Sequence, residues 1–483
     1  YFNVISDSKD LTFTPRVYFD NKILAQTEFR TIDADTKNTL DFSFLNNPDG
    51  ANQNHFFSKS QKELKVDGFL DSDLYLNVQK TSDDTFLKTY KIESPLINNT
   101  SSLQSLIGLN LYKEDFSFNT EFQVYENLNA KKIDRYEYIL PTYALTKDLG
   151  YAFNTSGTTS FVSTGHVKNY NTNILESINI NDLLYDSDYG YSENGLQKNY
   201  KILLKNTNTK GKNSPSFKEK NDHTIGSILQ YNMSYPLIKS GTTYNDFLTP
   251  ITTINFSPNK SKNNKDADFR IDTTNIFSLN RTGDTQSVEG GLSMVYGLEY
   301  FKSNMKNQNV LEAKIANQMR LEEDKNLPTH STLGQKSSNI VGNFVINPSD
   351  HLNLNYNYSI DENLRDTNYQ SLSSTLKVNN FITTFEYINE NKSQENSFLS
   401  NETTYNIDDN ISIGFNTRSN KETSLTEYYN LIYQYKNDCL IAAVEYNKDY
   451  YSDRTLKADE SIFFKLTIIP FGETSSPNLR KWN

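Results

Sequence analysis

The chain has 483 residues, and its 48 lysines and arginines stand against 59 aspartates and glutamates, a net charge of −11. This acidic balance is spread along the chain and excludes nucleic acid as a partner, because phosphate binding needs a basic face. Hydrophobic residues make up only 36% and mean hydropathy is −0.68, but the 13% aromatic residues argue against a disordered chain.

Apolar and polar side chains alternate in segments that recur from one end of the chain to the other. The predicted strands include, in chain order, residues 11–19, 74–78, 116–124, 352–360, 425–435, 439–447 and 461–469. Side chains of a strand point alternately to opposite faces, so each segment predicts a ribbon with one apolar and one polar face. No apolar run reaches the roughly 18 to 20 residues of a membrane helix, and only a closed barrel could then span a bilayer.

The predicted strands are joined by two kinds of connection. Tight turns are predicted at Asp20-Asn21-Lys22, Asp71-Ser72-Asp73, Asp408-Asp409-Asn410 and Lys436-Asn437-Asp438, and long polar loops at 206–222, 257–268 and 321–336. Outer-membrane barrels show this asymmetry, and at roughly 18 residues per strand the chain gives about 26 strands. We therefore predict an all-β fold, one large antiparallel transmembrane β-barrel over residues 1–483, with no linker that would divide it.

The two ends of the chain carry further expectations. The chain opens at Tyr1 with neither an initiator methionine nor an apolar signal region, so we expect it to be cut from a longer, exported precursor. If the last strand, 461–469, returns to the periplasm, the turn at Lys436-Asn437-Asp438 is periplasmic too. Cys439 then lies at the periplasmic rim.

Several motifs, in a fixed order along nearly the whole chain, resemble the barrel domain of the LptD family, the outer-membrane proteins that assemble lipopolysaccharide (LPS). They are Tyr1-Phe2-Asn3-Val4-Ile5, Asp10-Leu11-Thr12-Phe13-Thr14-Pro15-Arg16, Glu28-Phe29-Arg30, Ser82-Asp83-Asp84-Thr85-Phe86-Leu87, Glu289-Gly290-Gly291, Tyr296-Gly297-Leu298, Asp438-Cys439 and Asp453-Arg454. The family's periplasmic N-terminal domain and a second, adjacent cysteine are missing, and the loops are shorter and rich in Asn and Lys. The resemblance implies a translocon of the Gram-negative outer membrane that inserts LPS into the outer leaflet.

Pro15 lies inside the first predicted strand, where it cannot donate a backbone hydrogen bond. From the residues alone, it marks either the start of the strand or a bulge, or an incompletely bonded seam between the first and last strands. The resemblance favours the seam, which is the lateral gate of the family. The residues expected at this gate are Thr14, Pro15 and Arg16 on one side and Phe464, Leu466 and Ile468 on the other.

Cys439 is the single cysteine of the chain. It is either a small apolar strand residue or half of a disulfide whose partner lies outside this chain. The resemblance implies the second, a bond that couples the barrel to the periplasmic N-terminal domain.

The resemblance also implies partners. These are LPS itself, a plug lipoprotein similar to LptE in the lumen, a periplasmic LPS bridge protein that binds through the N-terminal domain, and the barrel insertion machinery, which would recognise the final strand. The alternative is a porin or a receptor-type channel with its own plug, both of which seal the seam.

Nothing in the sequence predicts an enzyme, a cofactor or a metal site. The five histidines are far apart and show no metal-ligand spacing, and no nucleophile or phosphate-binding motif is present. A polar group in the middle of the chain is expected to line the lumen or a loop turn; its members are Asp272, Asn275, Arg281, Asp284 and Glu289.

Overall fold

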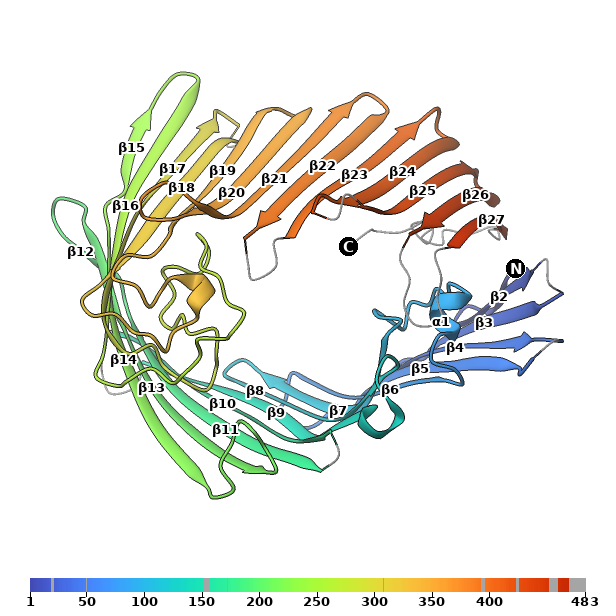
Figure 1. The fold of residues 1–483 in the computed structure, drawn as a ribbon, viewed down its shortest axis with the longest axis horizontal. Coiled ribbons are helices and arrows are strands. Elements are labelled where there is room, and N and C mark those ends of the chain that lie inside the picture. Colours follow the sequence, from blue (N-terminus) through green and yellow to red (C-terminus); the bar gives the residue numbers. More distant parts are fainter. Residues whose placement is uncertain are drawn as a thin grey trace.

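The computed structural model describes residues 1–468 except 19–20, 49, 152–155, 172, 307, 392–395, 423–424 and 451–458. One antiparallel sheet of 27 strands curls around a lumen (Figure 1). The predicted all-β barrel of about 26 strands is therefore confirmed. The family motif Asp453-Arg454 lies outside the described residues.

The strands of the first half are β1 (Phe2–Ser6), β2 (Lys9–Val17), β3 (Ile23–Ile32), β4 (Thr36–Asn46), β5 (Gln53–Glu63), β6 (Asp71–Thr81), β7 (Ser102–Lys113), β8 (Phe116–Asn127), β9 (Tyr136–Gly150), β10 (Gly157–Tyr170), β11 (Ile174–Ser187), β12 (Gly190–Tyr191), β13 (Gln197–Lys212) and β14 (Asp222–Ser234). Those of the second half are β15 (Leu237–Ser240), β16 (Tyr244–Ser257), β17 (Gly291–Asn304), β18 (Asn309–Arg320), β19 (Ile340–Ser349), β20 (Leu352–Ile360), β21 (Thr367–Val378), β22 (Phe381–Glu390), β23 (Asn396–Asn406), β24 (Ile411–Asn420), β25 (Leu425–Lys436), β26 (Leu440–Asp449) and β27 (Asp459–Ile468).

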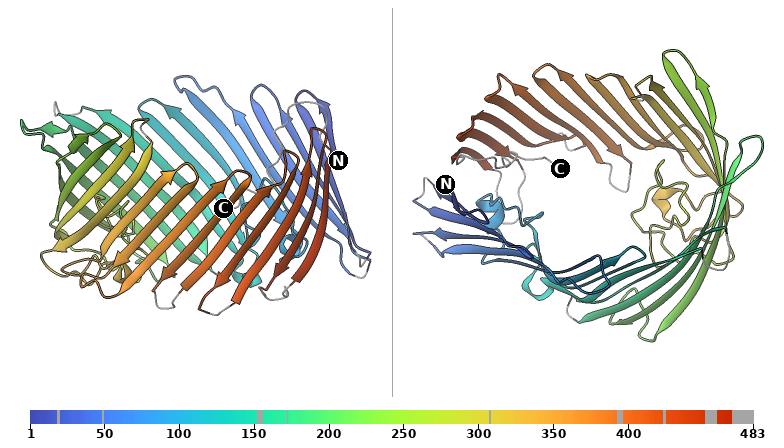
Figure 2. Two further views of the ribbon diagram at one scale, coloured as in Figure 1. Left: turned by 90° about the horizontal axis from the view of Figure 1, so that it is seen from above. Right: turned by 180° about the vertical axis from the view of Figure 1, so that it is seen from behind.

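Among the described residues, helical structure is confined to α1 (Phe86–Thr89) and to short 3-10 turns such as η1 (Lys132–Asp134) and η3 (Thr329–Ser331). No helix in the described ranges is long and apolar enough to cross a membrane. The main strands pair with their neighbours in the chain, and the short β12 and β15 extend hairpins by pairing with β13 and β16. Figure 2 shows the resulting ring of tilted strands from the side and from behind.

The apolar faces of the strands point outward. In β17, Leu292, Met294 and Tyr296 are about 40% exposed, whereas Ser293 and Val295 between them are 3% and 0% exposed. Exposed apolar side chains alternate in the same way with inward polar ones on most strands. This arrangement places hydrocarbon against lipid and polar groups around the lumen, as expected of an outer-membrane barrel.

Two of the predicted connections are wrong. Asp71-Ser72-Asp73 begins β6 and is not a turn, because Asp73 points inward, where it accepts a hydrogen bond from Gln61 and another from Asn110 at 2.7 Å. Residues 206–212, predicted as loop, continue β13. Their polarity comes from a ladder of luminal asparagine contacts, for example between Asn181 and Asn206.

Two cross-strand pairs place a tyrosine ring directly over a glycine. Tyr75 of β6 lies opposite Gly108 of β7, and Tyr358 of β20 lies opposite Gly342 of β19. A Cβ atom at either glycine would lie within 2.4 Å of the tyrosine ring. These glycines are therefore required by the close approach of the ring and help to fix the register of the sheet.

The connections 258–290 and 321–339 fold into the lumen (Figure 1). The sequence predicted loops there, but as polar segments without a core. Instead they enclose an apolar cluster that includes Ile271, Ile276, Leu327 and Leu333, which is packed on Val295 and Val341 of the wall. The inward loops thus form a fixed body on the side of the lumen away from the chain ends.

Candidate functional site

The structure places the two ends of the sheet side by side without joining them. β27 pairs with β26, β1 pairs with β2, and β2 pairs with β3. Among the described residues, no backbone pairing joins β27 to β1 or β2, and Figure 1 shows the two edges facing each other. We call this junction the seam. The sequence predicts residues 11–19, which correspond to β2, as the first strand, but β1 precedes it, paired with Lys9 to Thr12 of β2.

Pro15 lies in β2, opposite Ala25 of β3. Phe13 donates its backbone N–H to the carbonyl of Tyr1 at 2.6 Å, so the odd residues of β2 direct their backbone polar groups toward the β1 side. The nitrogen of Pro15, which carries no hydrogen, therefore faces the seam side of β2. Pro15 removes one donor from that edge.

Two other strand prolines, Pro141 and Pro250, lie away from the edges of the sheet. Pro141 of β9 lies at irregular register with both neighbouring strands, and Pro250 of β16 lies where β14 ends and β15 begins. Prolines within sheets are confined to bulges and edges. Pro141 occupies a bulge and Pro250 lies opposite the break between two strands, whereas Pro15 belongs to the edge.

The other predicted gate residues lie on different faces of the wall. Arg16 points inward and donates from Nη1 to the carbonyls of Tyr90 and Lys91 at 2.8 and 3.0 Å. Phe464 and Leu466 are 81% and 63% exposed, on the outer face of β27. Thr14 is exposed and lies opposite Gln26, and Ile468 lies opposite Leu440. Among the described side chains, no hydrogen bond or ion pair joins these two groups.

The seam is backed on its luminal side by the connection between β6 and β7, residues 82–101, which we call the strap. Phe86, Leu87, Tyr90 and Ile92 of the strap are buried against wall residues, which are Leu24, Leu45, Phe57 and Leu103. Gln26 donates to the carbonyl of Glu93 at 2.9 Å, and Gln79 donates to that of Leu96 at 2.7 Å. The strap is thus fixed to strands β3 to β7. In the sequence, only its first residues, Ser82 to Leu87, were singled out, as a family motif.

Beneath the strap lies a Ser–His–Asp arrangement that sequence analysis did not find. The Ser43 Oγ is 2.6 Å from His55 Nδ1, and His55 Nε2 is 3.3 Å from Asp41 Oδ1. All three residues are at most 2% exposed, and Gln26 donates to both Asp41 oxygens. Since no substrate could reach Ser43, these groups satisfy one another and support the strap.

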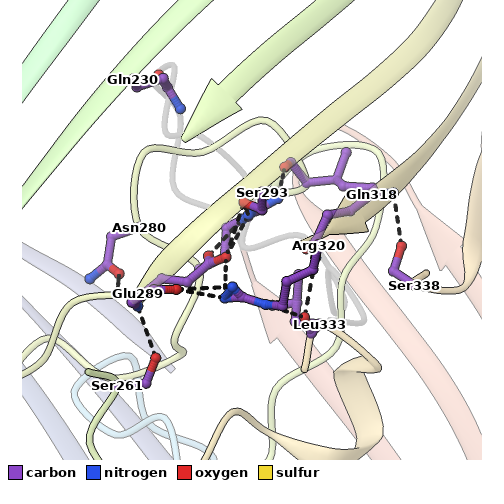
Figure 3. A network of polar contacts seen from close by, with 12 residues as sticks. Gln230, Ser261, Asn280, Glu289, Ser293, Gln318, Arg320, Leu333 and Ser338 are labelled. Atoms are coloured by element: carbon purple, nitrogen blue, oxygen red, sulfur yellow. Dashed lines mark hydrogen bonds and ion pairs between the residues drawn. The ribbon is translucent and has the colours of Figure 1, made fainter. Parts of the chain in front are cut away.

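A second buried polar network holds the inward loops. Arg281 donates from Nη2 and Nε to the two oxygens of Glu289 at 2.6 and 2.9 Å, and Arg320 reaches Glu289 at 3.1 Å. Figure 3 shows how Arg320 also approaches Leu333, whose carbonyl accepts from Nε at 3.2 Å. Arg281 and Glu289, expected to line the lumen or a loop turn, are therefore buried structural groups.

Cys439 lies in the turn between β25 and β26, and its thiol is half-buried. Its backbone N–H donates to Asn437 Oδ1 at 2.9 Å. Because β27 runs antiparallel to β26, this turn lies at the same end of the barrel as the end of β27. The predicted tight turn is confirmed, while the disulfide stays a prediction.

Comparison with known proteins gives one family. The family model described as "LptD: LPS transport system D" matches residues 52–402, from the start of β5 into β23. No curated protein matches the chain. Among solved structures, the FrpB iron transporter from Neisseria meningitidis is similar over 96% of this chain in two variants. The F3-3 variant is 10% identical with a TM-score of 0.33 over 81% of its own chain. The F5-1 variant is 8% identical with a TM-score of 0.35 over 82% of its own chain.

Proposed function

The chain belongs to the LptD family, the LPS transport proteins of the Gram-negative outer membrane, and on that premise we propose that it inserts LPS into the outer leaflet through the seam. The matched residues 52–402 include neither edge of the seam. The route through the seam is therefore proposed from the geometry of β1, β2 and β27.

The physical problem is that LPS is an amphiphile with a charged sugar-phosphate head and hydrocarbon chains. Moving the head through hydrocarbon would cost many kcal/mol. A polar lumen next to a weak seam solves this, since the head can travel inside while the chains pass between the edges into lipid. The polar luminal residues suit the sugar-phosphate head. The exposed apolar side chains on the two edges, such as Val17 and Phe464, suit the acyl chains.

The observation that carries the proposal is the missing pairing between β27 and β1 or β2 in the described part of the chain, together with the orientation of Pro15. Opening a seam joined by a full ladder of backbone hydrogen bonds would require breaking each of them in lipid, where no water replaces them. A porin or a plugged receptor channel would require such a ladder.

The test compares two proline variants in cells that depend on the variant protein. Pro15→Val supplies the missing donor on the seam side and should slow the appearance of LPS at the cell surface. Pro250→Val is the matched control, because it changes a strand proline far from the seam and should leave surface LPS at the wild-type level. If LPS appeared at the cell surface equally fast in wild type and Pro15→Val, the proposed route would be refuted.

Partners are proposed from the family rather than from contacts. They are a plug lipoprotein similar to LptE in the lumen, a periplasmic bridge protein that delivers LPS, and the insertion machinery acting on β27. We also propose that Cys439 forms a disulfide with a cysteine outside this chain. No catalytic role is proposed, because transport needs no covalent step and Ser43 is inaccessible.

A further inference from the structure

Two side chains of the strap reach across the seam to the last strands. Lys91 Nζ lies 3.0 Å from Ser461 Oγ of β27 and 3.5 Å from Asp449 Oδ2 of β26, and it lies over the ring of Phe463 at 5.4 Å. Glu93 Oε1 lies 3.3 Å from Lys465 Nζ of β27.

The backbone of the same segment is bound to the other edge. Arg16 of β2 holds the carbonyl of Lys91, and Gln26 of β3 holds that of Glu93. Each of these two strap residues therefore has its backbone on the first edge and its side chain on the last. Lys91 adopts a left-handed conformation with φ of 45°, which follows α1 directly and turns the chain there.

The charges across the seam alternate in sign. Lys91 meets Asp449 and Glu93 meets Lys465 across the seam, while Glu445 of β26 binds Lys465 on the same side of it. The side chains of Lys91 and Lys465 are 27% and 32% exposed, and those of Asp449 and Glu93 are 43% and 55% exposed. Partly exposed ion pairs shift an equilibrium by only about 1.5- to 5-fold each, so these contacts hold the edges together reversibly.

We propose that the strap is a latch across the seam, and that phosphate groups of the transported glycolipid release it by taking over Lys91 and Lys465. This inference rests on the proposed route through the seam. Phosphate oxygens form charge-assisted hydrogen bonds with ammonium groups, as the carboxylates do. A phosphorylated head that arrives at the luminal side of the seam therefore competes directly with Asp449 and Glu93.

The latch is tested by measuring the width of the seam in the full-length protein with its native partners in lipid nanodiscs. Spin labels on noncanonical residues at Val17 and Ile462, both exposed on the outer face, leave Cys439 unchanged. Pulsed electron paramagnetic resonance then gives the fraction of molecules with separated edges. Lys91→Ala should raise this fraction about 2- to 5-fold, and Lys91→Ala with Lys465→Ala should raise it further. Lys91→Glu with Asp449→Lys should bring it back toward the wild-type value.

Lys201→Ala is the matched control. It removes a partly exposed luminal lysine of β13 whose ion-pair partner, Asp186 of β11, lies away from the seam, and it should leave the separated fraction unchanged. If Lys91→Ala raised the fraction no more than Lys201→Ala, the latch would be refuted.

The ligand is tested in the wild-type protein with three additions. LPS should raise the separated fraction, whereas the same glycolipid after phosphatase treatment, and inorganic phosphate alone, should not. Opening by the dephosphorylated glycolipid would overturn the role of phosphate, and opening by inorganic phosphate would overturn its assignment to the glycolipid. The distance measurement needs no export, so a failed latch is distinguishable from a failed export route, which Pro15→Val tests in cells.

Discussion

Removing the carboxylate of Glu289 should destabilise the barrel more than removing almost any other single charge. Glu289 is 4% exposed and is the counter-charge of Arg281 and Arg320, whose side chains are 0% and 2% exposed. Breaking a buried ion pair by removing one partner costs about 3–5 kcal/mol, because the remaining charge stays buried. Glu289→Ala leaves two arginines in this state, although Arg320 keeps its bonds to the carbonyls of Gly290 and Leu333.

The assay is the free energy of unfolding, obtained by urea titration of the protein in lipid bilayers. Glu299→Ala, on the strand β17 that follows Glu289, is the matched control, because Glu299 is 41% exposed and its pair with Lys314 is long, at 3.8 Å. The control should lose at most about 1 kcal/mol. Arg281→Met with Glu289→Leu should lose less than Glu289→Ala, since apolar residues of similar volume replace a buried pair at little cost. If Glu289→Ala fell within 1 kcal/mol of the control, the network would not stabilise the fold as argued.

Three further predictions concern the wall, the strap and the thiol. Leu204→Arg in the middle of β13 places a charge on the outer face, where it should cost about 2–4 kcal/mol in bilayers; no loss in the same urea titration would contradict the outward orientation. Phe86→Ala empties the core of the strap and should cost about 3–5 kcal/mol, and it should raise proteolysis of residues 82–101; an unchanged cleavage pattern would count against a packed strap. A non-reducing gel of the full-length protein should show a mobility shift that Cys439→Ser removes, and an identical band for both would leave Cys439 as a packing residue.

The fold could be predicted from the sequence wherever one face of a strand was clearly apolar. The predicted segment 352–360 coincides with β20, because its alternation has no exception. Where polar residues occupied both faces, as in 206–212, a loop was predicted in error, since luminal asparagines that bond one another look like solvent-exposed ones. The tight turn before Cys439 was predicted correctly because a short polar triplet separates two alternating segments.

The luminal part of the site could not be predicted from the sequence. The contact between Lys91 and Ser461 joins residues 370 positions apart, and only the closure of the whole ring brings them together. α1 has four residues, too few for a helical periodicity to show in the sequence. The pairing of Arg281 with Glu289 likewise depends on the loop turning inward, which polar composition alone does not indicate.

The strap packs its apolar side chains against only one side of the seam, the N-terminal side. Its apolar cluster is built on β3, β4, β5 and β7, so the N-terminal edge is a double-layered wall, whereas β26 and β27 form a single layer in the described part of the chain. Because the bending stiffness of a wall rises with its thickness, we expect the C-terminal edge, β26 and β27, to move when the seam opens, while the N-terminal edge stays in place. The C-terminal edge carries Phe464 and Leu466 on its outer face. Acyl chains that leave the protein would then pass along a mobile apolar surface on the C-terminal edge. The sugar head would remain against the immobile N-terminal edge.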